Sequence, residues 1–386
     1  MRILLTSDAY KPITNGVVTS LVNLQQGLSI LGHEVRILTL SQTHTTYYQN
    51  GVWYLSSWNS GRIYPGTRVR DTLGKKTIRD IINWKPEVVH SHCEFSTFSL
   101  ARHIAQVVGV PLLHTYHTLY EDYTNYFSPS KRLGQMMAQR FSRNILEKVD
   151  CIIAPTTKIE RLLRSYGVTK LIRVIPSGID LAKFSTHNQK GDTNALRTRY
   201  GIPKENQVVI YVGRLATEKR VHELLANFSH EKKNRTLLLV GDGPQRESLE
   251  QLSTTLGLQD QVKFAGMQKQ QDIPSFYHMG DVFCSASTSE TQGLTYVEAL
   301  ASGLPVLCRA DECLDDVIQD GVNGWQYQTL EEYHQYLDHI CDDETIRKTL
   351  SMQALESSKR YARETYASAV SALYEQRIQR YRIVSA

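Results

Sequence analysis

The sequence predicts an α/β protein built from two doubly wound, Rossmann-like domains that face a central cleft. Its 386 residues exceed one ordinary hydrophobic core and favour two domains of roughly 150–200 residues each. Short apolar segments alternate with longer amphipathic ones along both halves, a rhythm that indicates parallel sheets covered on both faces. A turn cluster at residues 176–180 separates the two series.

The expected strands are short, continuous apolar segments. In the first half they are Ile3–Ser7, Val35–Leu40, Val88–Ser91, Val110–Thr115, Cys151–Ala154 and Ile172–Ile175. In the second half they are Val208–Val212, Thr236–Val240, Val262–Ala265, Val282–Ser285 and Pro305–Cys308. Helical segments lie between them, for example Ser20–Leu31 and Ser99–Val108.

These elements set the expected domain boundaries. We expect an N-terminal domain over residues 1–180, a C-terminal domain over 190–362 and a final helix over 363–386 that packs back on the first domain. In open α/β sheets, ligands bind beyond the carboxyl ends of the strands. The loops that follow the strands are therefore where we expect chemistry.

Composition excludes several classes of protein. The formal charge of +5 from 44 basic and 39 acidic residues suits an acidic ligand or an anionic surface, but it is too small and dispersed to indicate nucleic-acid binding. The six cysteines form no CxxC pair, so a structural zinc site is not expected. The cysteine pattern instead suits a protein of the reducing cytoplasm. The apolar segment at the N-terminus is too short for a signal peptide, and no segment approaches the ~20 apolar residues of a membrane span.

Two cations follow the strand Val208–Val212. Arg214 and Lys219 stand five residues apart in a loop that begins with Gly213. Paired cations match a nucleotide diphosphate, both when it binds and when it becomes a leaving group. An ordinary basic loop is the alternative.

Two carboxylates follow the strand Val282–Ser285. Glu290 lies in the loop, Gly293 ends it, and a helix is expected over Leu294–Ala301. The free amides of Leu294 and Thr295 would form an anion site. Glu298 lies one turn in, with its side chain directed back toward the helix start, where it could accept hydrogen bonds from ribose hydroxyls. Glu290 could reach a sugar hydroxyl; the alternative is a helix with an acidic first turn.

Further candidates follow strands of the first half. Gly16 precedes a helical segment and would let backbone amides approach a phosphate. His117 follows the strand Val110–Thr115, where it could contact a donor sugar. Both residues could instead be structural. His90 and His92 with His117 suggest a metal site only weakly, because no carboxylate spacing completes one.

A basic amphipathic helix is expected over Lys131–Lys148. Its apolar face consists of Leu133, Met136, Met137, Phe141 and Ile145, and its cations are Lys131, Arg132, Arg140, Arg143 and Lys148. Such a helix can lie on anionic lipid. A surface helix packed on its own domain, with Met136 and Met137 in the core, is an equal alternative.

One glycine motif is set aside. Residues 241–244, Gly-Asp-Gly-Pro, follow a strand as a dinucleotide-binding fingerprint would, but Arg246 stands where the third glycine is needed. Pro244 better suits the first turn of a helix.

In their order along the chain, these motifs resemble the large retaining glycosyltransferase family four (group 1, glycogen-synthase-like), which has the GT-B fold. The resemblance spans nearly the whole chain and includes the Glu-x7-Glu pattern from Glu290 to Glu298. It implies an N-terminal acceptor domain and a C-terminal domain that binds the nucleotide sugar, and transfer with retention and without metal or other cofactor.

The resemblance also implies a role for each candidate residue. The expected catalytic residues are His117, Glu290, Arg214 and Lys219. The expected nucleotide-sugar contacts are Gly16, Arg214, Lys219, Glu290, Gly293, Leu294, Thr295 and Glu298. Within these sets the two cations bind the diphosphate, Glu298 the ribose and Glu290 the sugar.

The segment from His117 to Tyr123, His-Thr-Leu-Tyr-Glu-Asp-Tyr, resembles a subgroup of bacterial diacylglycerol glucosyltransferases, which are peripheral enzymes of the cytoplasmic membrane face. It implies a UDP-sugar donor, with glucose as the hexose, and a lipid acceptor. Lys131, Arg132, Arg140 and Arg143 are the expected membrane contacts. A polyprenyl-linked, cell-wall or teichoic glycan acceptor is the first alternative, and a UDP-sugar epimerase is the second.

Overall fold

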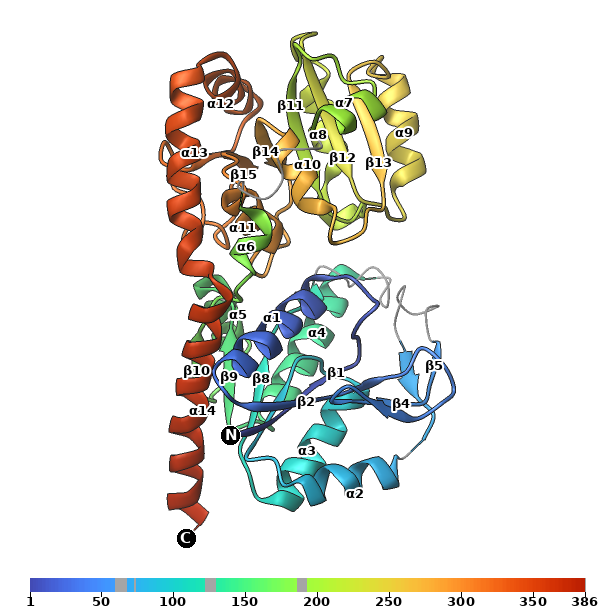
Figure 1. The fold of residues 1–386 in the computed structure, drawn as a ribbon, viewed down its shortest axis with the longest axis vertical. Coiled ribbons are helices and arrows are strands. Elements are labelled where there is room, and N and C mark those ends of the chain that lie inside the picture. The colour runs from blue at the N-terminus through green and yellow to red at the C-terminus, as the bar shows by residue number, and fades with distance from the viewer. Residues whose placement is uncertain (60–67, 73, 122–129, 186–192, 386) are drawn as a thin grey trace. The chain divides into compact units, whose positions relative to one another are not determined.

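The computed structural model describes residues 1–59, 68–72, 74–121, 130–185 and 193–385. It divides the chain into two compact units. Unit 1 comprises Met1–Ile179 and Arg363–Ala386, and unit 2 comprises Asp180–Ala362. Each unit contains its own largely parallel sheet with helices beside it (Figure 1).

Unit 1 is built on an eight-stranded sheet in the order β10-β9-β8-β7-β1-β2-β4-β3. Its strands are β1 (Arg2–Ser7), β2 (Glu34–Leu40), β3 (Tyr47–Gln49), β4 (Val52–Leu55), β7 (Val88–Ser91), β8 (Leu112–Thr115), β9 (Cys151–Ala154) and β10 (Ile172–Val174). Only β3 runs antiparallel to its neighbour among these pairs. A separate pair joins β5 (Ser57–Asn59) and β6 (Arg68–Arg70). The chain order reverses between β1 and β7, where such sheets bind ligands.

Helices cover both faces of this sheet. They are α1 (Gly16–Ile30), α2 (Lys75–Trp84), α3 (Ser96–Val108), α4 (Lys131–Leu146), α5 (Thr157–Ser165) and α14 (Arg363–Ser385). One core cluster joins the sheet to α1 and α14, and another joins it to the remaining four helices.

The C-terminal helix α14 packs along α1 within unit 1 (Figure 1). A Cβ on Gly27 would lie 2.5 Å from the Cβ of Ala367, so the glycine permits this close approach. Polar contacts reinforce the packing, because His33 Nε2 lies 2.8 Å from Ser371 Oγ. The last segment of the chain thereby completes the core formed by the first.

Unit 2 contains a six-stranded sheet in the order β13-β12-β11-β14-β15-β16, with every pair parallel. Its strands are β11 (Gln207–Val212), β12 (Arg235–Val240), β13 (Val262–Gly266), β14 (Val282–Ser285), β15 (Val306–Arg309) and β16 (Gly324–Tyr327). Numbered within the unit this is 3-2-1-4-5-6, the Rossmann order, which reverses between β11 and β14.

The helices of unit 2 are α6 (Leu181–Phe184), α7 (Thr193–Arg199), α8 (Val221–Phe228), α9 (Arg246–Thr255), α10 (Ile273–Met279), α11 (Leu294–Ala301), α12 (Leu330–Asp342) and α13 (Glu344–Ser358). Two short 3-10 helices are η3 (Thr217–Lys219) and η4 (Lys359–Tyr361). Residues of α8, α9, α12 and α13 share a core with one face of the sheet. On the other face of the sheet, Phe283 of β14 contacts the rings of Tyr277 in α10 and Tyr296 in α11.

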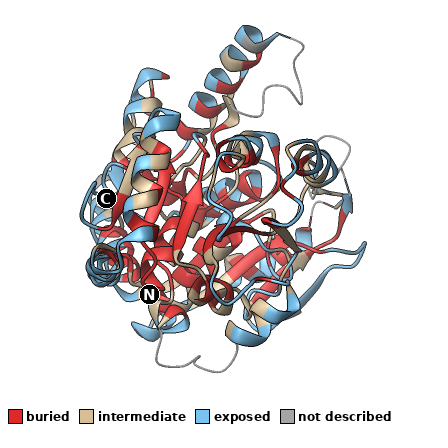
Figure 2. Cartoon of the chain, turned by 90° about the horizontal axis from the view of Figure 1, so that it is seen from above, coloured by how far each residue is buried: buried red, intermediate tan, exposed pale blue. Residues whose placement is uncertain are grey.

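The central strands of both sheets are buried, while the outer sides of the helices are exposed (Figure 2). The edge strand β3 is exposed, and the other edge strand of that sheet, β10, is buried only at its first residue. This burial explains why the strands are continuous apolar segments rather than alternating ones. The expected α/β class with two parallel sheets is confirmed. The helix expected from Ser20 begins earlier, at Gly16, because the Asn15 side chain caps it by accepting from Val18 N at 2.9 Å.

Candidate functional site

The two cations of unit 2 lie in the loop that follows β11, at the point where the strand order reverses. Lys219 ends η3, and Arg214 lies near the loop start. The loop is held by the neighbouring loop after β12: Gly213 N donates to Val240 O at 2.9 Å, and Leu215 N donates to Asp242 O at 3.0 Å. Both cations are therefore presented by backbone that the sheet fixes.

Gly241 and Gly243 make this contact between the loops possible. Gly241 has a φ of +134°, and a Cβ there would lie 1.9 Å from the carbonyl oxygen of Gly213. A Cβ on Gly243 would lie 2.4 Å from Leu215 O. The Gly-Asp-Gly-Pro motif at residues 241–244 thus supports, through its backbone, the loop that holds Arg214.

Lys219 and Glu290 form an ion pair in unit 2. Lys219 Nζ lies 2.6 Å from Glu290 Oε1, and the two side chains are 23% and 14% exposed. Burial lowers the pKa of the ammonium, but the carboxylates of Glu290 and Glu218 outweigh it, and the pKa is raised above its ordinary value. The backbone is tied at the same place, because Ser289 Oγ donates to Glu218 O at 3.2 Å. Lys219 is therefore a permanent cation.

The helix α11 is preceded by Gly293 at its N-cap, whose φ of +75° lies in the left-handed region. A Cβ there would meet the ring of Tyr296 at 2.6 Å, so only glycine fits without rearrangement. Leu294 and Thr295 form the first turn, and Glu298 follows one turn later. This places backbone amides and a carboxylate at the same end of the helix.

Glu298 lies in an unusual environment for a carboxylate. Burial raises its pKa to about 7, although the hydroxyl of Tyr277 and the charge of Lys183 act to lower it. Tyr277 Oη donates to Glu298 Oε2 at 3.0 Å. The arrangement holds one hydrogen-bond acceptor in place that is poorly solvated, which suits it to receive hydroxyl donors of a ligand.

In unit 1, Gly16 is exposed at the first turn of α1. A Cβ on Gly16 would meet no atom within 4 Å, so the space beside this helix start is open. His117 follows β8 and is half-buried. Its Nε2 lies 3.0 Å from Nδ1 of His92, which is buried after β7. Burial lowers the pKa of His117 to about 3, so this ring is neutral at physiological pH.

The neighbouring histidines have structural partners. His90 Nδ1 lies 2.6 Å from Tyr374 Oη, and its Nε2 lies 2.7 Å from Thr115 Oγ1, so both nitrogens are engaged. His114 is fully buried with Nδ1 2.6 Å from Ser91 Oγ. Within the described ranges, no group of three histidine, cysteine or acidic side chains is placed to hold a metal ion.

The helix α4 packs in an unexpected orientation. Its buried positions are Gly134, Ala138, Ser142 and Leu146, which recur every four residues. The hypothesis that Met136 and Met137 are core residues is wrong, because their exposed fractions are 59% and 51%, and Leu133 beside them is 51% exposed. Small residues let the helix lie close to its unit, and the large apolar residues remain outside.

The cations of α4 flank this exposed apolar surface. Arg132, Arg140 and Arg143 are exposed, whereas the Lys131 side chain lies outside the described structure. Phe141 and Ile145 are half-buried, and the Phe141 ring stacks on exposed Phe95 with centroids 5.6 Å apart. In the described part of the chain, no helix is both long and apolar enough to cross a membrane.

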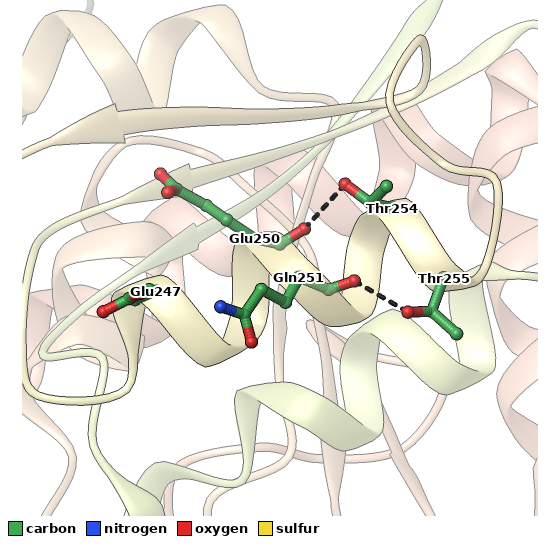
Figure 3. A pocket seen from close by; sticks show the side chains of 5 residues that line it. All are labelled: Glu247, Glu250, Gln251, Thr254 and Thr255. Carbon is green, nitrogen blue, oxygen red and sulfur yellow. Dashed lines mark hydrogen bonds between the residues drawn. The ribbon is translucent and has the colours of Figure 1, made fainter.

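A shallow hollow of about 440 Å³ lies elsewhere, along α9 of unit 2. It is lined by Glu247, Glu250, Gln251, Thr254 and Thr255 of that one helix (Figure 3). Both threonine hydroxyls donate to carbonyl oxygens of the preceding turn. No cation or second element contributes to the lining, so this hollow gives no indication of an anionic ligand.

Sequence reasoning missed the residues that support the site. Tyr277 lies in α10, far along the chain from the end of α11 that its hydroxyl reaches, and no local pattern indicates it. The histidine pattern suggests a metal ligand at His92, whereas its position just beyond the end of β7 places it beside the loop that follows β8. No local pattern indicates Glu94, which accepts a hydrogen bond from Tyr120 at 2.5 Å.

A pair of cations, a helix N-terminus and two carboxylates at the switch point of a Rossmann-like unit define a class of protein that binds an anionic, hydroxyl-rich ligand. Comparison with known sequences gives that class a family. Residues 192–357 match the model "Glycosyl transferases group 1", and residues 14–183 match "Glycosyltransferase Family 4". The chain belongs to this family of glycosyltransferases and has its GT-B fold.

Curated relatives and solved structures are similar over most of the chain. Alpha-monoglucosyldiacylglycerol synthase of Acholeplasma laidlawii is 34% identical over 97% of this chain and 96% of its own. The synthase of that name from Streptococcus pneumoniae is 34% identical over 85% and 75%. The crystal structure of Anabaena Alr3699/HepE with UDP-glucose is 20% identical, covers 97% of this chain and 100% of its own, and has a TM-score of 0.77, a likeness of fold.

Proposed function

We propose that this glycosyltransferase moves a hexose, glucose, from a UDP-sugar to the hydroxyl of a lipid such as diacylglycerol, with retention at the anomeric carbon. The observation that supports it most is the set of four charged residues, Arg214, Lys219, Glu290 and Glu298, at the switch point of unit 2. The names of the two synthases and of the UDP-glucose complex support the choice of donor and acceptor.

On the donor side, each charge has a distinct task. Arg214 and Lys219 bind the diphosphate, together with the first amides of α11. Glu298 accepts from the ribose hydroxyls, and Glu290 accepts from the sugar. Lys219 and Glu290 lie 2.6 Å apart. The bond between the phosphate and the sugar of a bound donor therefore lies beside this pair, with the phosphate at Lys219 and the sugar at Glu290.

In the transfer step, the acceptor oxygen forms a bond to the anomeric carbon as the bond from that carbon to the phosphate oxygen breaks. The electron pair leaves with UDP, and the acceptor proton passes to the departing phosphate oxygen on the same face. Arg214 and Lys219 stabilise the negative charge that develops there. His117, neutral because burial lowers its pKa to about 3, contacts the sugar as a hydrogen-bonding group rather than as a cation. These chain groups supply the charge stabilisation without metal.

On the acceptor side, we propose that α4 lies on an anionic membrane surface as a peripheral contact, on the cytoplasmic face. Leu133, Met136 and Met137 are exposed together, and Arg132, Arg140 and Arg143 are exposed on the same helix. Apolar side chains that enter the interface and arginines that meet anionic headgroups are the two components of such binding. A protein bound to the membrane in this way would reach a lipid acceptor within the membrane itself.

Vesicle flotation tests the membrane contact. The protein should float with vesicles that contain phosphatidylglycerol and should float less with neutral phosphatidylcholine vesicles. Arg132→Glu with Arg140→Glu should reduce flotation and activity on lipid. Arg102→Glu with Arg161→Glu is the matched control, because these arginines are exposed on α3 and α5. Equal flotation of both double variants would contradict the assignment of α4.

Product analysis separates the alternative reactions. An enzyme that acts on a polyprenyl-linked or teichoic glycan acceptor would leave diacylglycerol unchanged. A UDP-sugar epimerase would release an altered nucleotide sugar with no acceptor present. The Lys219–Glu290 pair at the switch point of a group 1 glycosyltransferase favours transfer.

A further inference from the structure

We propose that His92 and Glu94, on the loop after β7, are positioning residues that hold the His117 segment in its working geometry. The inference rests on the proposed function, in which His117 contacts the sugar of the donor. It goes further because it assigns a task to two buried groups that do not themselves touch the ligand.

The two loops are neighbours because of strand register. β7 pairs in parallel with β8, and Ser91 lies opposite His114. The chain after each strand therefore leaves the sheet at the same edge. His92 is fixed there by its own backbone, whose N donates to Thr6 O of β1 at 2.8 Å. The loop after β7 is thus a rigid platform beside the more exposed loop of His117.

His92 makes the first contact across the loops. Its Nδ1 lies 3.0 Å from Nε2 of His117, and the rings are stacked with centroids 5.3 Å apart. His90 lies behind it, with ring centroids 4.3 Å apart, and is itself held by Tyr374 and Thr115. A chain of rings therefore fixes the His117 imidazole from the interior of unit 1.

Glu94 makes the second contact. Its Oε2 accepts from Tyr120 Oη at 2.5 Å, three residues beyond His117. Its other oxygen, Oε1, lies 3.2 Å from Nε2 of the buried His114. The Glu94 side chain is only 4% exposed. The segment that contains His117 is therefore tied to the β7 loop at two points.

The bonding of His92 indicates a role beyond packing. The His92 ring is 1% exposed, and its Nε2 has no hydrogen-bond partner in the structure as described. Its side-chain hydrogen bond is directed to His117. Burial of an imidazole with an unmet nitrogen is costly, and an apolar residue would fill the space without that cost. Burial also lowers the pKa of both rings, so both are neutral, and one of the two facing nitrogens donates its proton to the other.

Three substitutions at His92 test the contact. Asparagine places a polar atom near the position of Nδ1, whereas glutamine reaches toward Nε2 and leucine has neither. We expect kcat with UDP-glucose to fall about tenfold for His92→Leu and His92→Gln, roughly the worth of one hydrogen bond. His92→Asn should keep most of the parent kcat, with little change in KM for the acceptor. His103→Leu, on the exposed surface of α3, is the matched control and should keep full activity.

A double-mutant cycle distinguishes positioning from general structural damage. If His92 acts through His117, His92→Leu should cause no further loss in a His117→Ala background. Additive losses, or equal activity of the asparagine and leucine variants, would overturn the proposal. Thermal unfolding of each variant identifies any that fail to fold, and the asparagine variant keeps the test valid if leucine does not fold.

Tyr120→Phe tests the second anchor without removing a charge. It should lower kcat several-fold, since it removes the hydroxyl that Glu94 accepts from. Unchanged kcat would overturn the role of Glu94. The failure of the proposed function looks different: there, the parent protein itself would transfer no glucose from UDP-glucose to lipid, whereas intact transfer in His117→Ala would refute only the role of His117.

Discussion

Removal of the Lys219 ammonium should separate two effects that its ion pair combines. In Lys219→Met, transfer loses one charge-assisted contact at the developing diphosphate anion, worth about 3 kcal/mol, so kcat/KM should fall about 10²-fold. The half-buried carboxylate of Glu290, 14% exposed, loses the ammonium that lies 2.6 Å from it. The unfolding free energy lost with this half-buried ion pair should lie between the values for a surface pair and a buried pair, at about 1–2 kcal/mol. This corresponds to a fall of roughly 2–8 °C in Tm.

The double variant Lys219→Met with Glu290→Gln distinguishes the two effects. It removes the carboxylate charge together with the ammonium, so its Tm should return toward that of the parent protein, while its activity stays low or falls further. Lys204→Met, at an exposed position, is the control for loss of a lysine and should change neither quantity. Recovery of activity in the double variant would refute the diphosphate assignment, because the pair would then be only structural.

Three other features give predictions of their own. Burial raises the pKa of Glu298 to about 7, and the ionised carboxylate is the better hydrogen-bond acceptor, so the KM for the donor should fall as pH rises through about 7. Glu298→Gln should abolish this pH dependence, and a KM of the parent protein that does not change with pH would contradict the prediction. Gly241→Ala should destabilise unit 2 by roughly 2 kcal/mol more than Gly257→Ala, since both glycines have positive φ but only Gly241 faces a backbone oxygen, at 1.9 Å; equal chemical denaturation of the two would count against this backbone support. Arg235→Met should cost about 3–5 kcal/mol of unfolding free energy, because Glu231, 2% exposed, loses the guanidinium at 2.5 Å and keeps the His334 imidazole on its other oxygen; an unchanged denaturation midpoint would rule this out.

Much of the fold could be predicted because parallel sheets buried on both faces require continuous apolar strands. β14 and α11 have the boundaries that the sequence indicates, Val282–Ser285 and Leu294–Ala301. The strand β16 was missed because Gly324–Tyr327 contains Trp325 and Gln326, both only half-buried at the edge of the sheet. Edge strands have weaker apolar patterns because one side remains open.

The candidate site could be predicted only in part. Arg214 and Lys219 lie in the loop after β11, and Glu290 and Glu298 lie in the loop and helix after the neighbouring strand β14, so topology alone predicts that they are near one another. Tyr277 reaches Glu298 from another helix through tertiary packing alone, which no local pattern encodes. Periodicity also left two interpretations of α4 open, because an apolar stripe on a helix does not reveal whether small residues on another face provide the packing.

The most direct test of the proposed function is to identify the product. The protein should be incubated with UDP-glucose, in which the glucose is α-linked, and vesicles of diacylglycerol with phosphatidylglycerol. We predict a lipid that has gained one hexose by mass spectrometry, with the α configuration by NMR, and release of UDP. A β-linked product would contradict retention. An altered nucleotide sugar without an acceptor product, or no glycolipid from any UDP-hexose, would contradict the proposed transfer to lipid.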